Sequence, residues 1–252
     1  MKTIIITGAS SGIGYELANL YAKPKTTLIL IARRKDRLEN IKSLCQKKGA
    51  TVEIFEHDMS SLENTKQLAE NIGNKFSTID LIILNAGISL GHKSKPSPYE
   101  DYEYLYRVNF LSNIAFLDPI LEKLKKQKSG QIVFISSLAS IITMPSSLAY
   151  SSSKRALNAY AEGLRYQLLP FKINITIIKP GFIKSELTDK NSFKMPFLLE
   201  LENGTKRIYN AIETKKIEFT FPKRFYYLIL FLKYLPNFIK DKIILSKAKK
   251  VL

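Results

Sequence analysis

The feature that most constrains this chain is a glycine cluster that follows its first apolar run. The segment TGASSGIG, residues 7–14, holds three glycines and three hydroxyl residues directly after the apolar stretch 3–7. Glycine loses more conformational freedom on folding than other residues, so the cluster indicates a sharp turn or a close backbone approach. A glycine turn between strand and helix binds a dinucleotide pyrophosphate with the free N–H groups of the helix. We therefore predict a nucleotide-binding turn; a merely tight turn is the alternative.

Short apolar runs alternate with helix-like stretches along the chain. Most runs are apolar at consecutive positions, as in parallel strands that are covered on both faces. The expected strands are 3–7, 27–32, 51–58, 81–87, 131–137, 174–181 and 216–222, and the expected helices are 12–22, 36–48, 61–76, 99–127, 149–168 and about 198–213. This order predicts one α/β domain over residues 1–252, a Rossmann-type, doubly wound parallel sheet of about seven strands with helices on both faces.

The end of the second expected strand distinguishes two dinucleotides. An acidic residue at this position binds the ribose 2′-hydroxyl of NAD, whereas an arginine favours the 2′-phosphate of NADP. Here Ala32 is followed by Arg33 and Arg34, and no carboxylate occurs before Asp36. Because a guanidinium pairs well with phosphate oxygens, the sequence predicts NADP(H) in preference to NAD(H). Two exposed arginines at a helix start are the alternative.

Polar residues stand at the expected ends of the third and fourth strands. Asp58 ends the third strand, where it is placed to contact an adenine edge, and Asn85, Ala86 and Gly87 end the fourth. Because ligands bind outside the carboxyl ends of parallel strands, these residues are expected at the same edge as the glycine turn. Turn formation is the alternative for each, since Asp, Asn and Gly suit strand exits.

A tyrosine and a lysine supply the candidate acid–base pair. Tyr150 and Lys154 lie four residues apart in the expected helix 149–168, so they share one helix face. With an ordinary pKa of about 10, tyrosine is a poor acid or base at neutral pH. A neighbouring ammonium stabilises the phenolate and lowers that pKa, which gives the spacing a chemical reason. For the pair alone, a solvated helix face is the alternative.

Three further residues are candidates for the same chemistry. Ser136 and Ser137 end the fifth expected strand, just before this helix. A serine hydroxyl there can hydrogen-bond a substrate carbonyl oxygen as that oxygen gains negative charge. Asn109, in the expected helix 99–127, is a candidate anchor for a proton-relay water, and an ordinary helix-surface amide is its alternative.

The segments TGASSGIG, NAG, VNF, ISS, YSSSK and KPGFI, in this order and spacing, resemble the short-chain dehydrogenase/reductase family over nearly the whole chain. The resemblance implies that Tyr150 is the general acid/base and that Lys154 lowers its pKa and binds the nicotinamide ribose. It also implies that Ser137 orients the substrate oxygen and that Asn109 supports the relay water. The expected cofactor-binding residues are Gly8, Ser10, Ser11, Gly12, Ile13, Gly14, Arg33, Arg34, Asp58, Asn85, Ala86, Gly87, Tyr150, Lys154, Pro180, Gly181, Ile183 and Ser185.

The chain departs from the family pattern at two places. Ser185 stands five residues after Pro180, where the family often has threonine, and the family's frequent glycine-rich C-terminal strand is absent. A homodimer or homotetramer is expected from the family, but the different ending leaves the transfer of quaternary structure open.

The function predicted from these features is an NADP(H)-dependent oxidoreductase. It would transfer a hydride between the nicotinamide and a carbonyl or secondary alcohol, in the reducing direction given the NADP preference. The alternatives are a non-catalytic NADP(H)-binding redox sensor and a membrane-surface-associated lipid carbonyl reductase.

The net charge, the single cysteine and the two histidines indicate which partners, compartment and metal sites to expect. The net charge is +17, yet the lysines are scattered and no arginine-rich or aromatic-interleaved tract occurs, so no nucleic acid is expected. A single cysteine, Cys45, fits a reducing compartment, and the short N-terminal apolar run is unlike a secretory signal, so a cytoplasmic location is expected. The two histidines, His57 and His92, lie outside any triad context, and no metal site is expected.

Two C-terminal segments are expected to shape the substrate site. A flexible loop at about 182–197 carries apolar residues that favour a hydrophobic substrate. The tail 223–252 is basic and apolar, with eight lysines or arginines against one acid, and its apolar stretch 225–235 is far shorter than the about 20 residues that span a bilayer. Peripheral contact with an anionic membrane is one interpretation. Cover over the substrate pocket or a subunit interface is the favoured one.

Overall fold

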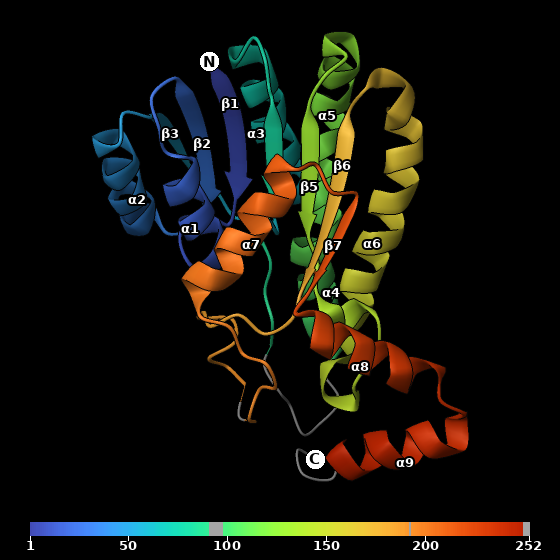
Figure 1. Ribbon diagram of the computed structural model, residues 1–252. Coiled ribbons are helices and arrows are strands. Elements are labelled where there is room, and N and C mark those ends of the chain that lie inside the picture. Colours follow the sequence, from blue (N-terminus) through green and yellow to red (C-terminus); the bar gives the residue numbers. More distant parts are fainter. Residues whose placement is uncertain (91–97, 192, 249–252) are drawn as a thin grey trace.

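A computed structural model describes residues 1–90, 98–191 and 193–248 of the chain. Within these residues the core is a seven-stranded, wholly parallel sheet in the order β3-β2-β1-β4-β5-β6-β7 (Figure 1). The strands are β1 (Lys2–Thr7), β2 (Thr26–Ala32), β3 (Thr51–Glu56), β4 (Leu81–Leu84), β5 (Gln131–Ile135), β6 (Asn174–Pro180) and β7 (Glu218–Phe221). The predicted doubly wound Rossmann-type sheet is confirmed.

Helices cover both faces of the sheet because the strands are apolar on both sides. In β1, Ile4 and Ile6 face one core and Ile5 faces the other, and all three are fully buried. The first core is closed by α1 (Gly12–Tyr21), α2 (Lys35–Lys47) and α7 (Leu201–Glu213), and the second by α3 (Leu62–Lys75), α5 (Ser112–Gln127) and α6 (Leu148–Leu168). Two buried layers therefore fix the sheet rigidly between the helices.

The predicted helix 99–127 is interrupted by a π-helical turn. The structure has α4 (Tyr99–Tyr106), a π-helical segment (Arg107–Leu111) and then α5. Within this turn the side-chain nitrogen of Asn113 donates to the carbonyl of Asn109 at 3.0 Å, and the Ser112 hydroxyl donates to the carbonyl of Val108 at 2.7 Å. These side chains satisfy carbonyls at the wider turn, so the helix continues beyond it. Such π turns are frequent at functional sites.

Several predicted strands are too long at their carboxyl ends. The third ends at Glu56, the fourth at Leu84 and the fifth at Ile135, so Asp58, Gly87 and Ser137 lie in the loops that follow. The residues that the sequence assigned to strand ends are thus free to face a site above the sheet. Short 3-10 turns occupy Leu138–Ser140, Pro145–Ser147 and Leu169–Phe171.

The chain after β7 forms two helices at the carboxyl end of the sheet. These are α8 (Lys223–Tyr234) and α9 (Asn237–Ala248), which extend away from the sheet and its flanking helices (Figure 1). Pro236 lies between them, where its ring prevents one continuous helix. In the described part of the chain, no helix combines the length and the apolar character needed to cross a bilayer.

Candidate active site

The turn from β1 into α1 depends on glycine at two positions. Gly8 has a φ of +67°, and a Cβ there would lie 2.9 Å from the Cα of Ala86. Gly14, in the first turn of α1, would place a Cβ 2.3 Å from the carbonyl oxygen of Gly8. A side chain at either position would therefore collide with backbone. The close packing explains why both glycines are needed.

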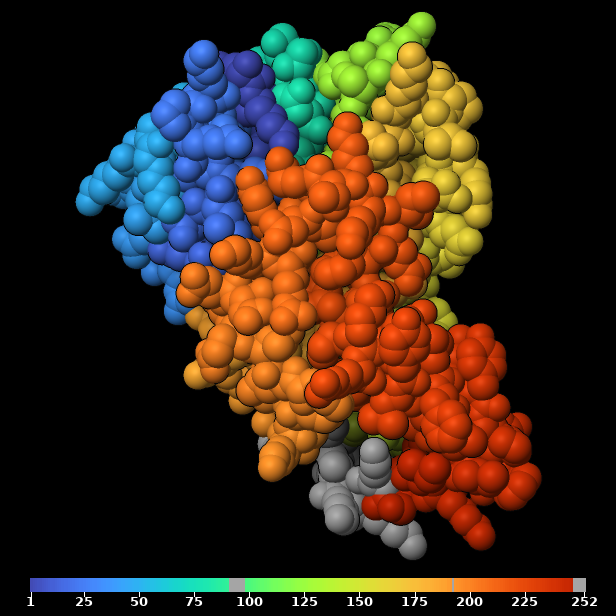
Figure 2. All heavy atoms as spheres, in the orientation of Figure 1, coloured from blue at the N-terminus to red at the C-terminus, as the bar shows by residue number. Residues whose placement is uncertain are grey.

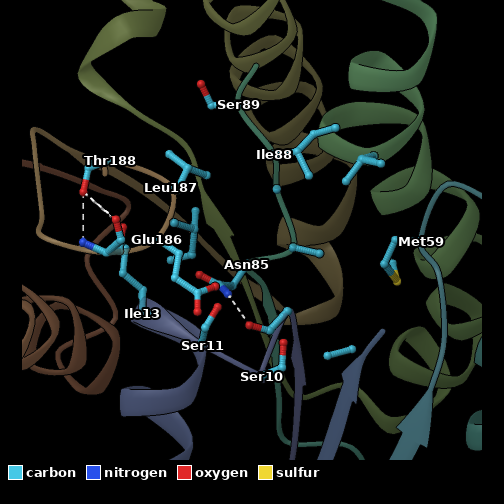
Figure 3. A pocket seen from close by; sticks show the side chains of 18 of the residues that line it. Ser10, Ser11, Ile13, Met59, Asn85, Ile88, Ser89, Glu186, Leu187 and Thr188 are labelled. Carbon is cyan, nitrogen blue, oxygen red and sulfur yellow. Dashed lines mark hydrogen bonds between the residues drawn. The ribbon is translucent and has the colours of Figure 1, made fainter. Parts of the chain in front are cut away.

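Polar contacts from Thr7 and Asn85 lock this turn against the end of β4. The Thr7 hydroxyl accepts hydrogen bonds from the backbone N–H groups of Asn85 and Ala86, both at 3.0 Å. The Asn85 amide donates to the carbonyls of Thr7 at 3.1 Å and Gly8 at 3.2 Å (Figure 3). The amide nitrogen of Asn85 thus holds the glycine turn against the end of β4.

A cavity of about 490 Å³ opens above the carboxyl ends of the strands. Seventeen of the eighteen expected cofactor-binding residues line this cavity, and Gly14 is the exception. Because the glycines of the turn carry no Cβ atoms, the turn leaves room for a dinucleotide diphosphate. The N-terminus of α1 has no acidic residue in its first turn, so its positive end also suits this anion. Gly14 lies behind Gly8, where it permits the close approach of helix and turn.

Arg34 connects the glycine turn to the loop after β6. Its guanidinium donates to the hydroxyls of Ser11 at 2.7 Å and Ser10 at 3.3 Å, and to the Glu186 carboxylate at 2.8 Å. Arg37 in α2 also pairs with Glu186. Partial burial raises the pKa of the Glu186 carboxyl, but the two arginines outweigh it and hold that pKa below its usual range. Glu186 and Ser11 both line the cavity, although they come from distant parts of the chain (Figure 3).

Arg33 lies at the same edge of the cavity with different partners. It donates to the hydroxyl of Tyr104 at 2.9 Å and lies 4.0 Å from a carboxylate oxygen of Asp58. The other carboxylate oxygen of Asp58 accepts a hydrogen bond from the backbone N–H of Ser60 at 2.9 Å. Asp58 therefore combines the predicted cavity position with the turn-forming role that was its alternative.

Tyr150 and Ser137 meet on the wall of the cavity. Tyr150 comes from the first turn of α6, and Ser137 follows β5. Removal of the Tyr150 hydroxyl from bulk solvent raises its pKa, and a hydrogen bond with the Ser137 side chain acts in the opposite direction. The Ser137 hydroxyl also accepts a hydrogen bond from the backbone N–H of Ala139 at 3.1 Å, which fixes its position. The two hydroxyls are thus placed to share one substrate oxygen.

Lys154 lies one helical turn after Tyr150 and is only 4% exposed. Its ammonium donates to the carbonyl of Ile135 at 2.9 Å and lies 6.0 Å from the centre of the Tyr150 ring. Burial lowers the pKa of Lys154 to about 8. The two side chains lie on the same side of α6, but burial dominates the pKa of both groups. The expected lowering of the tyrosine pKa by this lysine stays a prediction.

Asn109 lies in the π-helical turn and is fully buried behind the cavity. Its side-chain oxygen accepts from the backbone N–H of Ile88 at 2.8 Å, and its nitrogen donates to the Ile88 carbonyl at 3.0 Å and the Ser153 hydroxyl at 3.3 Å. Asn109 is therefore no surface amide. It fixes the backbone of Ile88, which lines the cavity, and it does not itself line the cavity.

The cavity includes residues that the sequence did not single out for this site. They are Ala32, His57, Met59, Ile88, Ser89, Val108, Ile135, Glu186, Leu187, Thr188 and Lys190. Glu186 and Lys190 lie in the loop after β6, and Lys190 donates to the carbonyl of Ser89 across the cavity at 3.3 Å. No local pattern marks these two charges, because their partners are distant in sequence.

His57, the histidine that the structure describes, has no contact with the acid–base group. His57 contacts the Thr65 hydroxyl at 2.7 Å, and burial lowers its pKa; His92 lies outside the described residues. Among the residues that the structure describes, no three His, Cys, Asp or Glu side chains gather in a way that could hold a metal ion.

Comparison with known proteins gives consistent matches. A family model described as short chain dehydrogenase matches residues 2–195. An uncharacterized oxidoreductase of Myxococcus xanthus is 32% identical over 236 residues, which cover 94% of this chain and 93% of that protein. A short-chain dehydrogenase from Sphingobium yanoikuyae in complex with NADPH has a TM-score of 0.80 at 22% identity, covering 87% of each chain. An alcohol dehydrogenase from the archaeon Thermococcus sibiricus, complexed with 5-hydroxy-NADP, has a TM-score of 0.77 at 25% identity, covering 88% of this chain and 96% of that one.

Proposed function

The chain belongs to the short-chain dehydrogenase family and is an oxidoreductase that acts on CH–OH or C=O groups, and we propose that it reduces a hydrophobic carbonyl compound with NADPH. The single observation that carries the proposal is the meeting of the Tyr150 and Ser137 hydroxyls inside a cavity floored by the glycine turn. In this proposal Tyr150 is the proton donor, and the glycine turn beside it binds the nucleotide. A bound nicotinamide supplies the hydride.

Tyr150 gives its proton to the substrate oxygen in this proposal. Ser137 hydrogen-bonds the same oxygen and stabilises the negative charge that develops on it. The Lys154 ammonium adds a positive charge below the tyrosine and is held in place by the Ile135 carbonyl. Asn109 keeps the Ile88 backbone fixed and supports the proton relay from behind the cavity.

The proposal keeps the cofactor-binding residues that the sequence predicts. Gly14 contributes through the shape of the turn between β1 and α1. Arg33 and Arg34 support the preference for NADP(H), because two guanidinium groups lie at the rim where a 2′-phosphate would pair with them. The nearest carboxylate to Arg34 is Glu186, which comes from the loop after β6 rather than from the end of β2. NAD-type recognition by an acid after β2 thus has no counterpart at this position.

Aromatic rings beside the cavity support a hydrophobic substrate. Phe182 packs edge-on against Phe193 at 5.6 Å and stacks on Phe225 of α8 at 5.9 Å, while Phe225 also packs against Phe197. This cluster joins the predicted substrate loop to α8, so that the tail reaches the substrate side of the molecule. The cluster adjoins the cavity at Gly181 and Ile183, which line it, and apolar surroundings of this kind suit a carbonyl compound with a hydrophobic body.

Two further expectations remain part of the proposal. A homodimer or homotetramer is expected from family membership, and a cytoplasmic location fits the single, buried Cys45. Both are readily measured, by sedimentation equilibrium and by cell fractionation.

The test of the proposed function is NADPH oxidation with a panel of ketones, aldehydes, keto-lipids and keto-sugars. Tyr150→Phe should lower turnover on the best substrate by about a hundredfold or more, since it removes the acid but keeps the ring. Replacing Arg33 or Arg34 by alanine should weaken NADPH binding more than NADH binding. Tight NADPH binding without turnover on any compound would instead favour a redox sensor.

A further inference from the structure

The outer side of α8 is apolar and exposed. Tyr227, Leu228, Phe231 and Tyr234 are between 51% and 78% exposed, and their spacing of three or four residues places them on one side of the helix. The opposite side packs on the protein through buried Ile229 and through Phe225. A helix that is apolar all round is ordinarily covered on all sides. We therefore expect the outer side of α8 to pack against a binding partner.

The second helix extends this surface. In α9, Phe238 and Leu245 are 70% and 55% exposed, and Ile239 is exposed beside them. In Figure 2 the red helices project as a lobe from the rest of the molecule. We call the exposed side of α8 and α9 the tail surface. Contiguous apolar surfaces of this kind mark interaction sites.

The charges around the tail surface distinguish between two partners that could cover it, a second copy of the chain and an anionic surface. Lys223 and Arg224 begin α8, Lys233 lies near its end, and Lys240 and Lys242 lie in α9. One acid, Asp241, accompanies these five cations. A second copy of the chain seated on this surface would bring the same five cations against them, which like-charge repulsion opposes at this place. An anionic surface would instead be attracted.

We propose that the tail surface binds an anionic lipid bilayer, with α8 and α9 lying in the plane of the interface. The apolar side chains enter the boundary between headgroups and acyl chains, and the lysines contact anionic headgroups, as in interfacial amphipathic helices. Tyr227 and Tyr234 suit this depth, because tyrosine has an apolar ring and a polar end. The proposal goes beyond the oxidoreductase activity and does not depend on it.

The location of the tail surface gives the proposal a consequence for the substrate. Phe225, on the inner side of α8, stacks on Phe182 and packs against Phe197 in the substrate loop. Binding of α8 to a bilayer would bring that loop close to the lipid. A substrate dissolved in the membrane could then enter from the bilayer side.

Sedimentation of the full chain with vesicles tests the proposal. The wild-type protein should sediment with mixed phosphatidylcholine–phosphatidylglycerol vesicles and much less with phosphatidylcholine alone, and added salt should weaken binding. Phe231→Ser should reduce the partition coefficient roughly tenfold, because it removes one large apolar anchor. Charge reversal by Lys233→Glu with Lys242→Glu should abolish the preference for anionic vesicles.

Leu169→Ser is the matched control. Leu169 is 61% exposed, similar to Phe231, but it precedes β6 at the amino ends of the strands, whereas α8 follows β7 at their carboxyl ends. It should bind vesicles as wild type does, and circular dichroism should show every variant folded. Equal binding of wild type and Phe231→Ser, or no binding to anionic vesicles, would overturn the proposal. So would a lipid-free dimer that Phe231→Ser converts to monomer, because a second copy would then cover the surface.

Discussion

Replacement of Lys154 by methionine tests how strongly the protein perturbs this buried amine. Lys154 is 4% exposed, and its pKa of about 8 lies below the 10.5 of an ordinary lysine because burial penalises its charge. Methionine fills a similar volume and cannot ionise. The substitution therefore removes the titration while keeping most of the packing.

The sign follows from proton binding in the two states. Between about pH 8 and pH 10.5 the unfolded chain holds the proton on this amine and the folded protein has lost it. Stability rises with pH wherever the unfolded state binds more protons. Lys154 therefore destabilises the fold below pH 8, and this destabilisation decreases as the pH rises. The interval between 10.5 and about 8 corresponds to about 3 kcal/mol. The lost hydrogen bond to Ile135 costs about 1 kcal/mol at every pH.

Urea unfolding of both proteins without cofactor, from about pH 7.5 to about pH 10.5, measures this contribution. The free energy of unfolding of wild type minus that of Lys154→Met should rise by about 2–3 kcal/mol across the range, since other titrating groups cancel. Lys126→Met, at an exposed position in α5, is the control and should give a flat difference. A flat difference for Lys154→Met as well would refute a burial-lowered pKa.

Three further substitutions test the walls of the cavity. Asn109→Ala leaves the Ile88 backbone groups unsatisfied and should cost about 2–4 kcal/mol in urea unfolding; unchanged stability would contradict the buried role. Gly14→Ala drives a Cβ into the Gly8 carbonyl and should abolish NADPH binding in fluorescence titration, or prevent folding, whereas Gly163→Ala, with open space around it, should do neither. Glu186→Gln releases Arg34 and should tighten NADPH up to about fivefold while NADH affinity stays constant; equal changes for both cofactors would exclude competition at the 2′-phosphate.

The sheet was predictable because its signal is local and repeated. Runs such as Ile4–Ile6 are apolar at consecutive positions, and their short length between turn signals is typical of strands covered on both faces. The glycine turn was predictable for a similar reason, since Gly8 and Gly14 mark close backbone approaches that a side chain would block. The carboxyl ends of the strands were harder to predict, because the sequence does not distinguish whether Asp58 or Ser137 is the last residue of a strand or a residue of the loop that follows.

The parts that could not be predicted depend on distant partners or on geometry without a pattern. Glu186 meets Arg34 across 152 positions of sequence, and nothing beside either residue announces the pair. The π-helical turn at Asn109 has no residue pattern of its own, so it is visible only from its hydrogen bonds. The helices of the tail were visible as apolar sequence, but the side of α8 that stays exposed depends on how Phe225 packs.

The pKa shifts of Tyr150 and Lys154 determine which protonation state of the tyrosine prevails at the centre of the site. Tyr150 has a raised pKa, so its neutral form, which carries the proton, prevails at neutral pH. A neutral phenol can donate a proton to a developing alkoxide, as carbonyl reduction requires, whereas alcohol oxidation requires the phenolate as base. Burial favours the neutral form of Lys154 as well, which weakens the cation that would stabilise a phenolate. Both shifts therefore favour the protonated tyrosine that the proposed carbonyl reduction would use.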